Sequence, residues 1–442
     1  MKIQLSDHFT YKKLIRFTLP SIIMMIFTSI YSVVDGIFVS NFVGKTPFAA
    51  LNLIMPFLMI FSAIGFMIGT GGSALVAMTL GEGDRNRANR LFSMLVYTII
   101  LLGILFTGVG LVFLRPVARL LGAEGEMLEY CVSYGRILAP ALTFFMLQTS
   151  FQSFLITAEK PGFGLAVTVG AGVTNMVLDA LFVAVFDWGL EGAAAATLLS
   201  QVVGGLVPLV YFAAPNSSLL RLTKCCFDGR ALWKTCTNGS SEMMTNISLS
   251  LVNMLYNFQL MRFAGEDGVA AYGVIMYVNF IFISIFIGYS IGSAPIIGYH
   301  FGARNHGELH NMYTKSLKLM CIFSLALTLL AELLAMPLSK IFVSYDAALL
   351  EMTCHAFMLY SLSFLVMGFN IFGSSFFTAL NNGLVSAAIS FMRTLVFQIA
   401  AVLALPVLLG LDGIWLAIVA AELLSLALTL YFFVRLRKQY HY

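Results

Sequence analysis

Four acidic residues and one basic residue interrupt the long apolar stretches of this sequence. They are Asp35, Asp179, Glu242, Glu422 and Arg393. A charged side chain is costly inside a bilayer, so such residues are rare there and commonly mark ion or substrate pathways. These five residues are therefore the first candidates for chemistry.

Two of the acids have a polar neighbour one helical turn earlier, Tyr31 before Asp35 and Asn175 before Asp179. Residues four apart share a helix face, so we expect two aspartates at similar depth, facing one cavity. This pair could alternate between a protonated state and an ionised state that accepts a cation. Na⁺ at Asp35, Asp179 and Asn175 is the one metal ion this pattern allows. The alternative is that each aspartate is a structural hydrogen-bonding group.

The elements that carry these residues are apolar and long. Hydrophobic residues make up 60% of the 442-residue chain and charged residues only 10%, against about 25% charged residues in soluble domains. A transmembrane helix needs about 20 apolar residues, and twelve runs satisfy this. They are residues 14–39, 48–79, 92–114, 130–158, 164–186, 190–213, 233–261, 269–300, 313–336, 348–380, 384–406 and 412–434. The sequence predicts an all-α integral membrane protein with twelve transmembrane helices.

The second half of the chain is a diverged copy of the first, shifted by 221 residues. Gly71 falls on Gly292, Gly81 falls on Gly302, and the segment 189–192 falls on 410–413. Six helices per half is an even number, so both halves must insert in the same orientation, as a parallel repeat about an axis along the membrane normal. Two similar lobes with a site between them are typical of transporters.

Three regions follow from the repeat. We expect an N-terminal six-helix lobe at residues 1–213, a cytoplasmic linker at 214–232 and a C-terminal six-helix lobe at 233–442. If the N-terminus is cytoplasmic, eighteen of the 25 lysines and arginines fall in inner segments. This bias predicts that both termini are cytoplasmic.

The repeat also indicates that the lobes have diverged. Asp35 maps onto Tyr256 and Asp179 onto Ala400, so the acidic pair is confined to the N-terminal lobe. Glu242 has no acidic counterpart, which makes it a candidate cavity residue or a structural element of a bent helix. Glu422 and Arg393 are expected to pair with each other.

Further polar residues within the predicted helices could line a cavity, or could hold helices together by hydrogen bonds. In addition to Glu242, the candidates are Gln148, Gln152, Asn253 and Asn257. Pro20 and Pro295 remove backbone hydrogen bonds and permit kinks. Such kinks could be static or could move with the protonation state.

No catalytic signature or ATP-binding domain is evident, so we expect no enzyme, no cofactor and no nucleic-acid partner. Transport would be driven by a proton or sodium gradient across the membrane. The six cysteines lack metal-binding spacing. A monomer is expected, because the cavity lies within one chain.

The combination of several residues and motifs, spread over the whole chain, resembles the pattern of the MATE (multidrug and toxic compound extrusion) transporters. They are Pro20, Tyr31 and Asp35, Asn175 and Asp179, Thr197 after the run 192–196, Glu242, and Pro295 followed by the segment 298–303. The acidic pair in the N-terminal lobe is similar to the bacterial DinF/MepA-like branch. The resemblance implies a V-shaped fold in a bacterial cytoplasmic membrane. It also implies export of organic cations by alternating access, in exchange for protons or sodium.

The same resemblance implies that Asp35, Asp179, Tyr31, Asn175 and Thr197 form the coupling site. The main alternative is a flippase for a lipid-linked saccharide or other amphiphile, which we would expect to have several basic residues in its cavity. A channel or a non-transporting membrane scaffold would need no asymmetric carboxylates. The sign of the cavity charge discriminates the antiporter from the flippase.

Overall fold

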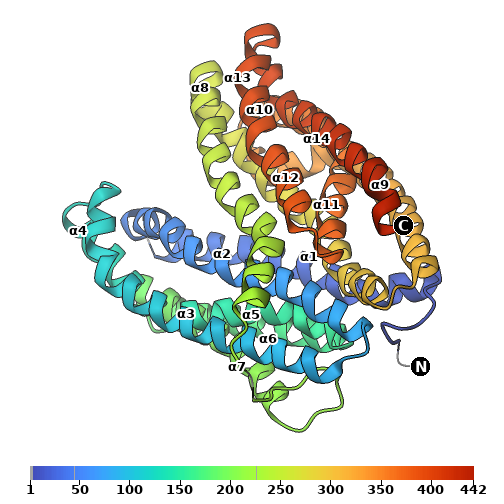
Figure 1. Cartoon of the computed structure of the whole chain (residues 1–442). Helices are drawn as coiled ribbons and strands as arrows, with labels where there is room; N and C mark the ends of the chain where they lie inside the picture. The colour runs from blue at the N-terminus through green and yellow to red at the C-terminus, as the bar shows by residue number, and fades with distance from the viewer. Residues whose placement is uncertain (1–2, 44, 225) are drawn as a thin grey trace.

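The computed structural model describes residues 3–43, 45–224 and 226–442, which form helices joined by short connections (Figure 1). The first half contains α1 (Tyr11–Phe42), α2 (Lys45–Gly81), α3 (Arg85–Leu120), α4 (Gly125–Leu138), α5 (Ala141–Thr157), α6 (Pro161–Asp179), the π-helical η1 (Ala180–Val185) and α7 (Gly189–Ala213). The second half contains α8 (Gly229–Gly302), α9 (His306–Val343), α10 (Ala347–Ser361), α11 (Phe364–Ala379), α12 (Gly383–Phe391), the π-helical η2 (Met392–Val396), α13 (Phe397–Leu409) and α14 (Leu411–Tyr440).

The helices account for twelve membrane spans. Within the described ranges, 9 helices are long and apolar enough to cross a bilayer, and counting each bent pair as a span gives 11. The 74-residue α8 contains a non-helical residue, Gly265 (φ 64°, ψ −149°), which divides it into two spans. The all-α expectation is confirmed, because a chain in lipid must satisfy its backbone polar groups within helices or closed barrels.

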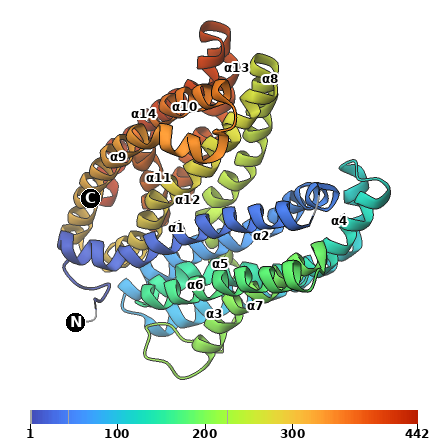
Figure 2. The ribbon, with the colours of Figure 1, turned by 180° about the vertical axis from the view of Figure 1, so that it is seen from behind.

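Two lobes diverge from the end of the molecule where both chain termini lie (Figures 1 and 2). The first consists of α1–α7, drawn in blue to green, and the second of α8–α14, drawn in yellow to red. Their divergence gives the V shape that the resemblance implies.

The backbone preserves the internal repeat. Gly189 begins α7 and has a φ of 57°, and Gly410 directly precedes α14 and has a φ of 62°. Each lobe also contains one broken span, bent by 55° between α4 and α5 and by 48° between α10 and α11. Pro140 lies at the first bend, whereas the equivalent position is Ser361. The equivalent spans are therefore bent alike with or without proline.

Small residues allow the two lobes to approach closely. A Cβ atom added to Gly71 on α2 would lie 2.6 Å from the backbone N of Gly239 on α8. The repeat-related contact is between Gly292 and Thr18, where the added Cβ would lie 3.1 Å from the Thr18 Cβ. Such residues let helix backbones touch, which drives association where lipid is as apolar as the helices.

The two candidate kink prolines lie within continuous helices. Pro20 lies inside α1 and Pro295 lies inside the second part of α8. The helix continues through the proline at both positions. Movement at these prolines therefore stays a prediction.

The connection between the lobes packs against α3. The Nη2 of Arg85 donates to the carbonyl of Ser218 at 2.9 Å, and the backbone N–H of Thr223 donates to the Ser93 hydroxyl at 2.8 Å. α8 begins at Gly229, so residues 229–232 of the expected linker form its first turn. The remaining segment, 214–228, is held on the N-terminal lobe in the part that the structure describes.

The segment before α1 contacts both lobes at the end of the molecule where the termini lie. The backbone N–H of Leu5 donates to Oε1 of Glu159 at 2.8 Å, between α5 and α6. The backbone N–H of Phe9 donates to Oε1 of Glu308 at 2.9 Å, on the first turn of α9. Leu5 and Phe9 are fully buried. This segment, residues 3–10, is called the N-terminal strap below.

Candidate functional site

The acidic pair of the N-terminal lobe lies where α1 packs against α6. Asp35 is half-buried on α1, and Asp179, the last residue of α6, is 1% exposed. Their carboxyl groups lie close enough to interact directly. Residues separated by 144 positions in sequence are therefore neighbours in the fold.

Two tyrosines interact electrostatically with this pair. The hydroxyls of Tyr31 on α1 and Tyr134 on α4 both lie within electrostatic reach of the two carboxyl groups. Gly172 on α6 leaves room for α1, since a Cβ added there would lie 2.5 Å from Cε1 of Phe27. The close packing of α1 on α6 brings the aspartates together.

Several polar atoms of this cluster lack partners. Among the described side chains, Oδ1 of Asp35, both carboxyl oxygens of Asp179 and Nδ2 of Asn175 are buried without a hydrogen bond. Leaving a buried polar group unpaired costs about 1–3 kcal/mol, and more for a charged group. Carboxyl and amide oxygens are also the ligand types that hard cations prefer. The cluster therefore has the donor set to hold a proton or a cation such as Na⁺.

Thr197 is the predicted coupling residue with the least contact to this cluster. It is half-buried on α7, which packs against α6, and its carbonyl accepts the hydroxyl of Ser200 at 2.8 Å. No described hydrogen bond joins its hydroxyl to either carboxyl group. Asp35, Asp179 and Tyr31 form the centre of the cluster, and Asn175 is buried one turn before Asp179.

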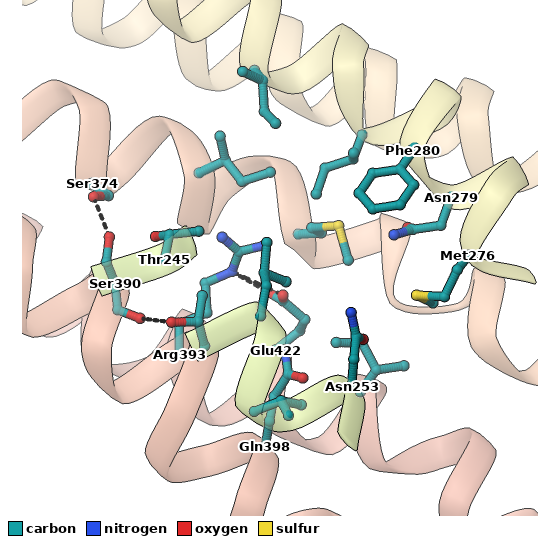
Figure 3. Close-up of a pocket in the computed structure, with 18 of the residues that line it drawn as sticks. Thr245, Asn253, Met276, Asn279, Phe280, Ser374, Ser390, Arg393, Gln398 and Glu422 are labelled. Carbon is teal, nitrogen blue, oxygen red and sulfur yellow. Dashed lines mark hydrogen bonds and ion pairs between the residues drawn. The ribbon is translucent and has the colours of Figure 1, made fainter. Parts of the chain in front are cut away.

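A separate pocket of about 180 Å³ lies in the C-terminal lobe (Figure 3). Two of the candidate cavity residues, Glu242 and Asn253, line it together with Met276, Asn279 and Phe280. These residues come from the two spans of α8, and the far wall comes from α10, α11, α12, η2, α13 and α14. We call this the C-lobe pocket.

Arg393 and Glu422 form an ion pair in the wall of the C-lobe pocket. The Nε of Arg393 lies 2.8 Å from Oε1 and 3.0 Å from Oε2 of Glu422. The Glu422 side chain is 0% exposed and also accepts the amide of Asn370 at 2.7 Å. The expected pairing is confirmed.

Three candidate cavity residues do not line this pocket. Gln148 packs against α7, where a Cβ added to Gly204 would lie 2.4 Å from its Cδ. Gln152 is half-buried on α5, and Asn257 is exposed on α8. Gln148 instead fits the alternative expected from the sequence, contact between helices.

Sequence reasoning did not single out three tyrosines at the candidate sites. Tyr256 and Tyr272 stack at 5.0 Å in the C-lobe pocket, and the Tyr272 hydroxyl donates to Asn253 at 2.8 Å. The repeat gave a signal for Tyr256, which occupies the position equivalent to Asp35. Tyr134 gave no signal, because nothing in the sequence links it to Asp35 or Asp179.

The protein is a helical membrane protein with two repeated lobes. One lobe contains buried carboxyl groups without a hydrogen-bond partner among the described residues, and the other contains a pocket with an ion pair in its wall. This is the architecture of a transporter. The MatE family model matches residues 20–181 and 243–403. The chain therefore belongs to the MatE family.

Curated relatives agree with this assignment. The multidrug export protein MepA of Staphylococcus aureus (strain MRSA252) is 23% identical over 425 residues, covering 94% of this chain and 92% of its own length. MepA of Staphylococcus haemolyticus (strain JCSC1435) is 23% identical over 319 residues, covering 72% of this chain and 70% of its own length. These matches place the chain in the MepA-like branch.

Solved structures share the fold. A MATE transporter crystallised with MaL6 superposes with a TM-score of 0.91 at 24% identity, covering 96% of this chain and 95% of that one. A multidrug resistance MATE transporter in an outward-facing conformation superposes with a TM-score of 0.90 at 24% identity, again covering 96% of this chain and 95% of that one. The two-lobe V-shaped fold is confirmed.

Proposed function

We propose that this protein is a secondary antiporter that exports organic cations and drugs in exchange for inward-moving protons or sodium. The observation that carries the proposal is the pair of half-buried Asp35 and buried Asp179, three of whose four carboxyl oxygens are buried without a hydrogen bond to any described residue. Export by the curated MepA relatives, as their names state, supports the same direction of transport.

The acidic pair supports coupling because it can hold either a proton or a cation. When ionised, the two carboxylates repel each other across a short distance in a poorly screened environment. Binding one proton or one Na⁺ relieves that repulsion. Release of the ion to the cytoplasm would favour a different arrangement of α1 and α6, and with it a different access to the substrate.

Alternating access is supported by where the lobes touch. Contacts between α2 and α8 and the N-terminal strap hold the lobes together at the end that carries the termini. With both termini cytoplasmic, as the distribution of basic residues predicts, this arrangement faces outward. The proposed location is a bacterial cytoplasmic membrane, and the proposed working unit is a monomer.

The charge of the C-lobe pocket favours an antiporter over a flippase for lipid-linked saccharides. Its one guanidinium, Arg393, is neutralised by Glu422, and Glu242 adds a further carboxyl group. A pocket for pyrophosphate would need surplus positive charge, which the described lining residues do not supply.

The decisive experiment is ethidium efflux in cells or proteoliposomes without other pumps, under imposed proton and sodium gradients separately. Wild type should export ethidium under one gradient, which identifies the ion, and Asp35→Asn should abolish the gradient-driven part. Asp267→Asn, an exposed carboxylate beside the break in α8, is the matched control and should behave as wild type. Absence of efflux under both gradients would contradict the proposal.

A further inference from the structure

Arg393 uses only part of its hydrogen-bonding capacity on Glu422. A guanidinium carries five N–H donors in a rigid fork, and the contacts at 2.8 Å and 3.0 Å both come from Nε. The terminal groups Nη1 and Nη2 make no hydrogen bond with any described residue. The side chain is 11% exposed and lines the C-lobe pocket.

The backbone fixes the position of this side chain. Arg393 lies in the π-helical turn η2, and π-turns recur at functional sites in helices. Glu422 is fully buried and is also bound by Asn370, which is not one of the residues that line the pocket. In Figure 3 the Arg393 head group lies within the ring of pocket residues. The guanidinium is therefore held by one edge with its other donors available.

The same pocket contains a second carboxyl group, for which no described residue forms an ion pair. Glu242 is half-buried, lines the pocket, and lies within electrostatic reach of Arg393 without forming an ion pair with it. No described hydrogen bond engages its carboxyl group. Phe280 and Met276 add apolar side chains to the wall of the same pocket (Figure 3).

We propose that the C-lobe pocket binds the carboxylate-bearing end of zwitterionic aromatic substrates, with the terminal N–H groups of Arg393 as the carboxylate subsite. Glu242 faces the cationic part of the same molecule. This inference rests on the proposed export function, because it names a substrate class for that transporter. A pocket of about 180 Å³ receives one end of such a molecule rather than the whole.

The charges explain why both ends are needed. With Glu422 cancelling Arg393, the remaining carboxyl group among the described lining residues is that of Glu242, which in its ionised form favours plain cations. A substrate carboxylate entering the same apolar region would be strongly disfavoured unless it were hydrogen-bonded and paired. Charge-assisted hydrogen bonds from a guanidinium fork supply that pairing with defined geometry.

Two dyes that differ by one methyl ester test the proposal. Rhodamine 110 is a zwitterion with a free carboxylate, and rhodamine 123 is its methyl ester, a cation of nearly the same shape. Binding of each to the purified full-length protein is measured by fluorescence polarisation. Wild type should bind both dyes.

Arg393→Lys keeps the charge opposite Glu422 but removes the fork. We expect it to weaken rhodamine 110 binding about tenfold, the effect of losing one hydrogen bond to a charged group, and to leave rhodamine 123 binding unchanged. The double variant Arg393→Met with Glu422→Gln removes both buried charges together, so it should fold, lose rhodamine 110 and retain rhodamine 123. Arg136→Lys, an exposed position on α4, is the matched control and should bind both dyes as wild type does.

An equal loss of both dyes in Arg393→Lys, with the protein still folded, would overturn the carboxylate subsite. Wild-type binding of rhodamine 123 without rhodamine 110 would also overturn it, while leaving the export function intact. Failure to bind either dye would overturn it as well, and the ethidium experiment would then decide the export function separately.

Discussion

Gly81 on α2 and Gly302 at the end of α8 each lie against the backbone of the other's helix. A Cβ added to Gly81 would lie 1.9 Å from the carbonyl O of Tyr299, and one added to Gly302 would lie 2.0 Å from the carbonyl O of Met78. The two contacts are related by the 221-residue repeat, because Met78 and Tyr299 are equivalent positions. The lobes therefore meet around a pseudo-twofold axis at the end that carries the termini.

Replacing Gly302 by alanine should separate the lobes at this end. The added methyl group cannot fit without moving the backbone of α2 away, so the arrangement seen here should lose population. Spin labels at the exposed positions Arg90 and His310, in a cysteine-free background, should report a longer mean distance. Gly170→Ala, whose added Cβ meets nothing within 4 Å, is the control, and an unchanged distance in Gly302→Ala would contradict the prediction.

Asp179→Asn should separate transport from folding. The substitution removes a group that can take up a proton or cation, so gradient-driven efflux should fall by at least about tenfold. The variant should be no less stable than wild type, because a buried carboxylate without a partner is itself unfavourable. Ethidium efflux and thermal unfolding in detergent check the two parts, and a variant with normal efflux would refute the coupling role.

The pair of Arg393 and Glu422 should give a strongly non-additive mutant cycle. Arg393→Met alone leaves a buried charge on Glu422, and we expect a loss of about 3–5 kcal/mol in the free energy of unfolding. Combining it with Glu422→Gln should restore most of that loss. Additive effects of the two single substitutions would mean that the charges do not depend on each other.

Glu308→Gln should loosen the N-terminal strap. The Glu308 carboxylate accepts the Phe9 N–H at 2.9 Å and contacts Nδ1 of His8 at 2.7 Å. A neutral amide weakens both contacts and loses any attraction to a protonated His8. Trypsin should then cleave at Lys12 and Lys13 about tenfold faster, as expected for losing about 1.4 kcal/mol of local stability.

The same digestion tests the orientation of the chain. With cytoplasmic termini, cleavage at these lysines should occur in inside-out vesicles and not in right-side-out vesicles. Glu351→Gln, at an exposed position on α10, is the control and should be cleaved at the wild-type rate. Equal cleavage of Glu308→Gln and wild type would show that the carboxylate does not hold the strap.

The sequence by itself determined the elements and their symmetry. Long apolar runs must become helices in lipid, so the spans followed from composition and length. The 221-residue repeat predicted two lobes in one orientation, and the positive φ of Gly189 and Gly410 at equivalent helix starts agrees with it. Helical periodicity likewise put Asn175 on the face of Asp179.

The tertiary structure decided which face of each helix meets protein and which meets lipid. Gln148 points at Gly204, Asn257 is exposed, and neither lines the C-lobe pocket. In a soluble helix the apolar stripe would reveal the buried side. Here lipid and protein interior are similarly apolar, so that signal is weak and packing of small residues sets the orientation.

Packing between helices also explains two features that no local sequence pattern predicts. The bend between α10 and α11 contains no proline, although the repeat places it opposite Pro140. The free edge of Arg393 depends on the π-turn η2 and on a glutamate supplied by α14, the last helix. Side chains far apart in sequence become partners only when helix packing fixes the distance between them. The tertiary structure therefore decided these interactions.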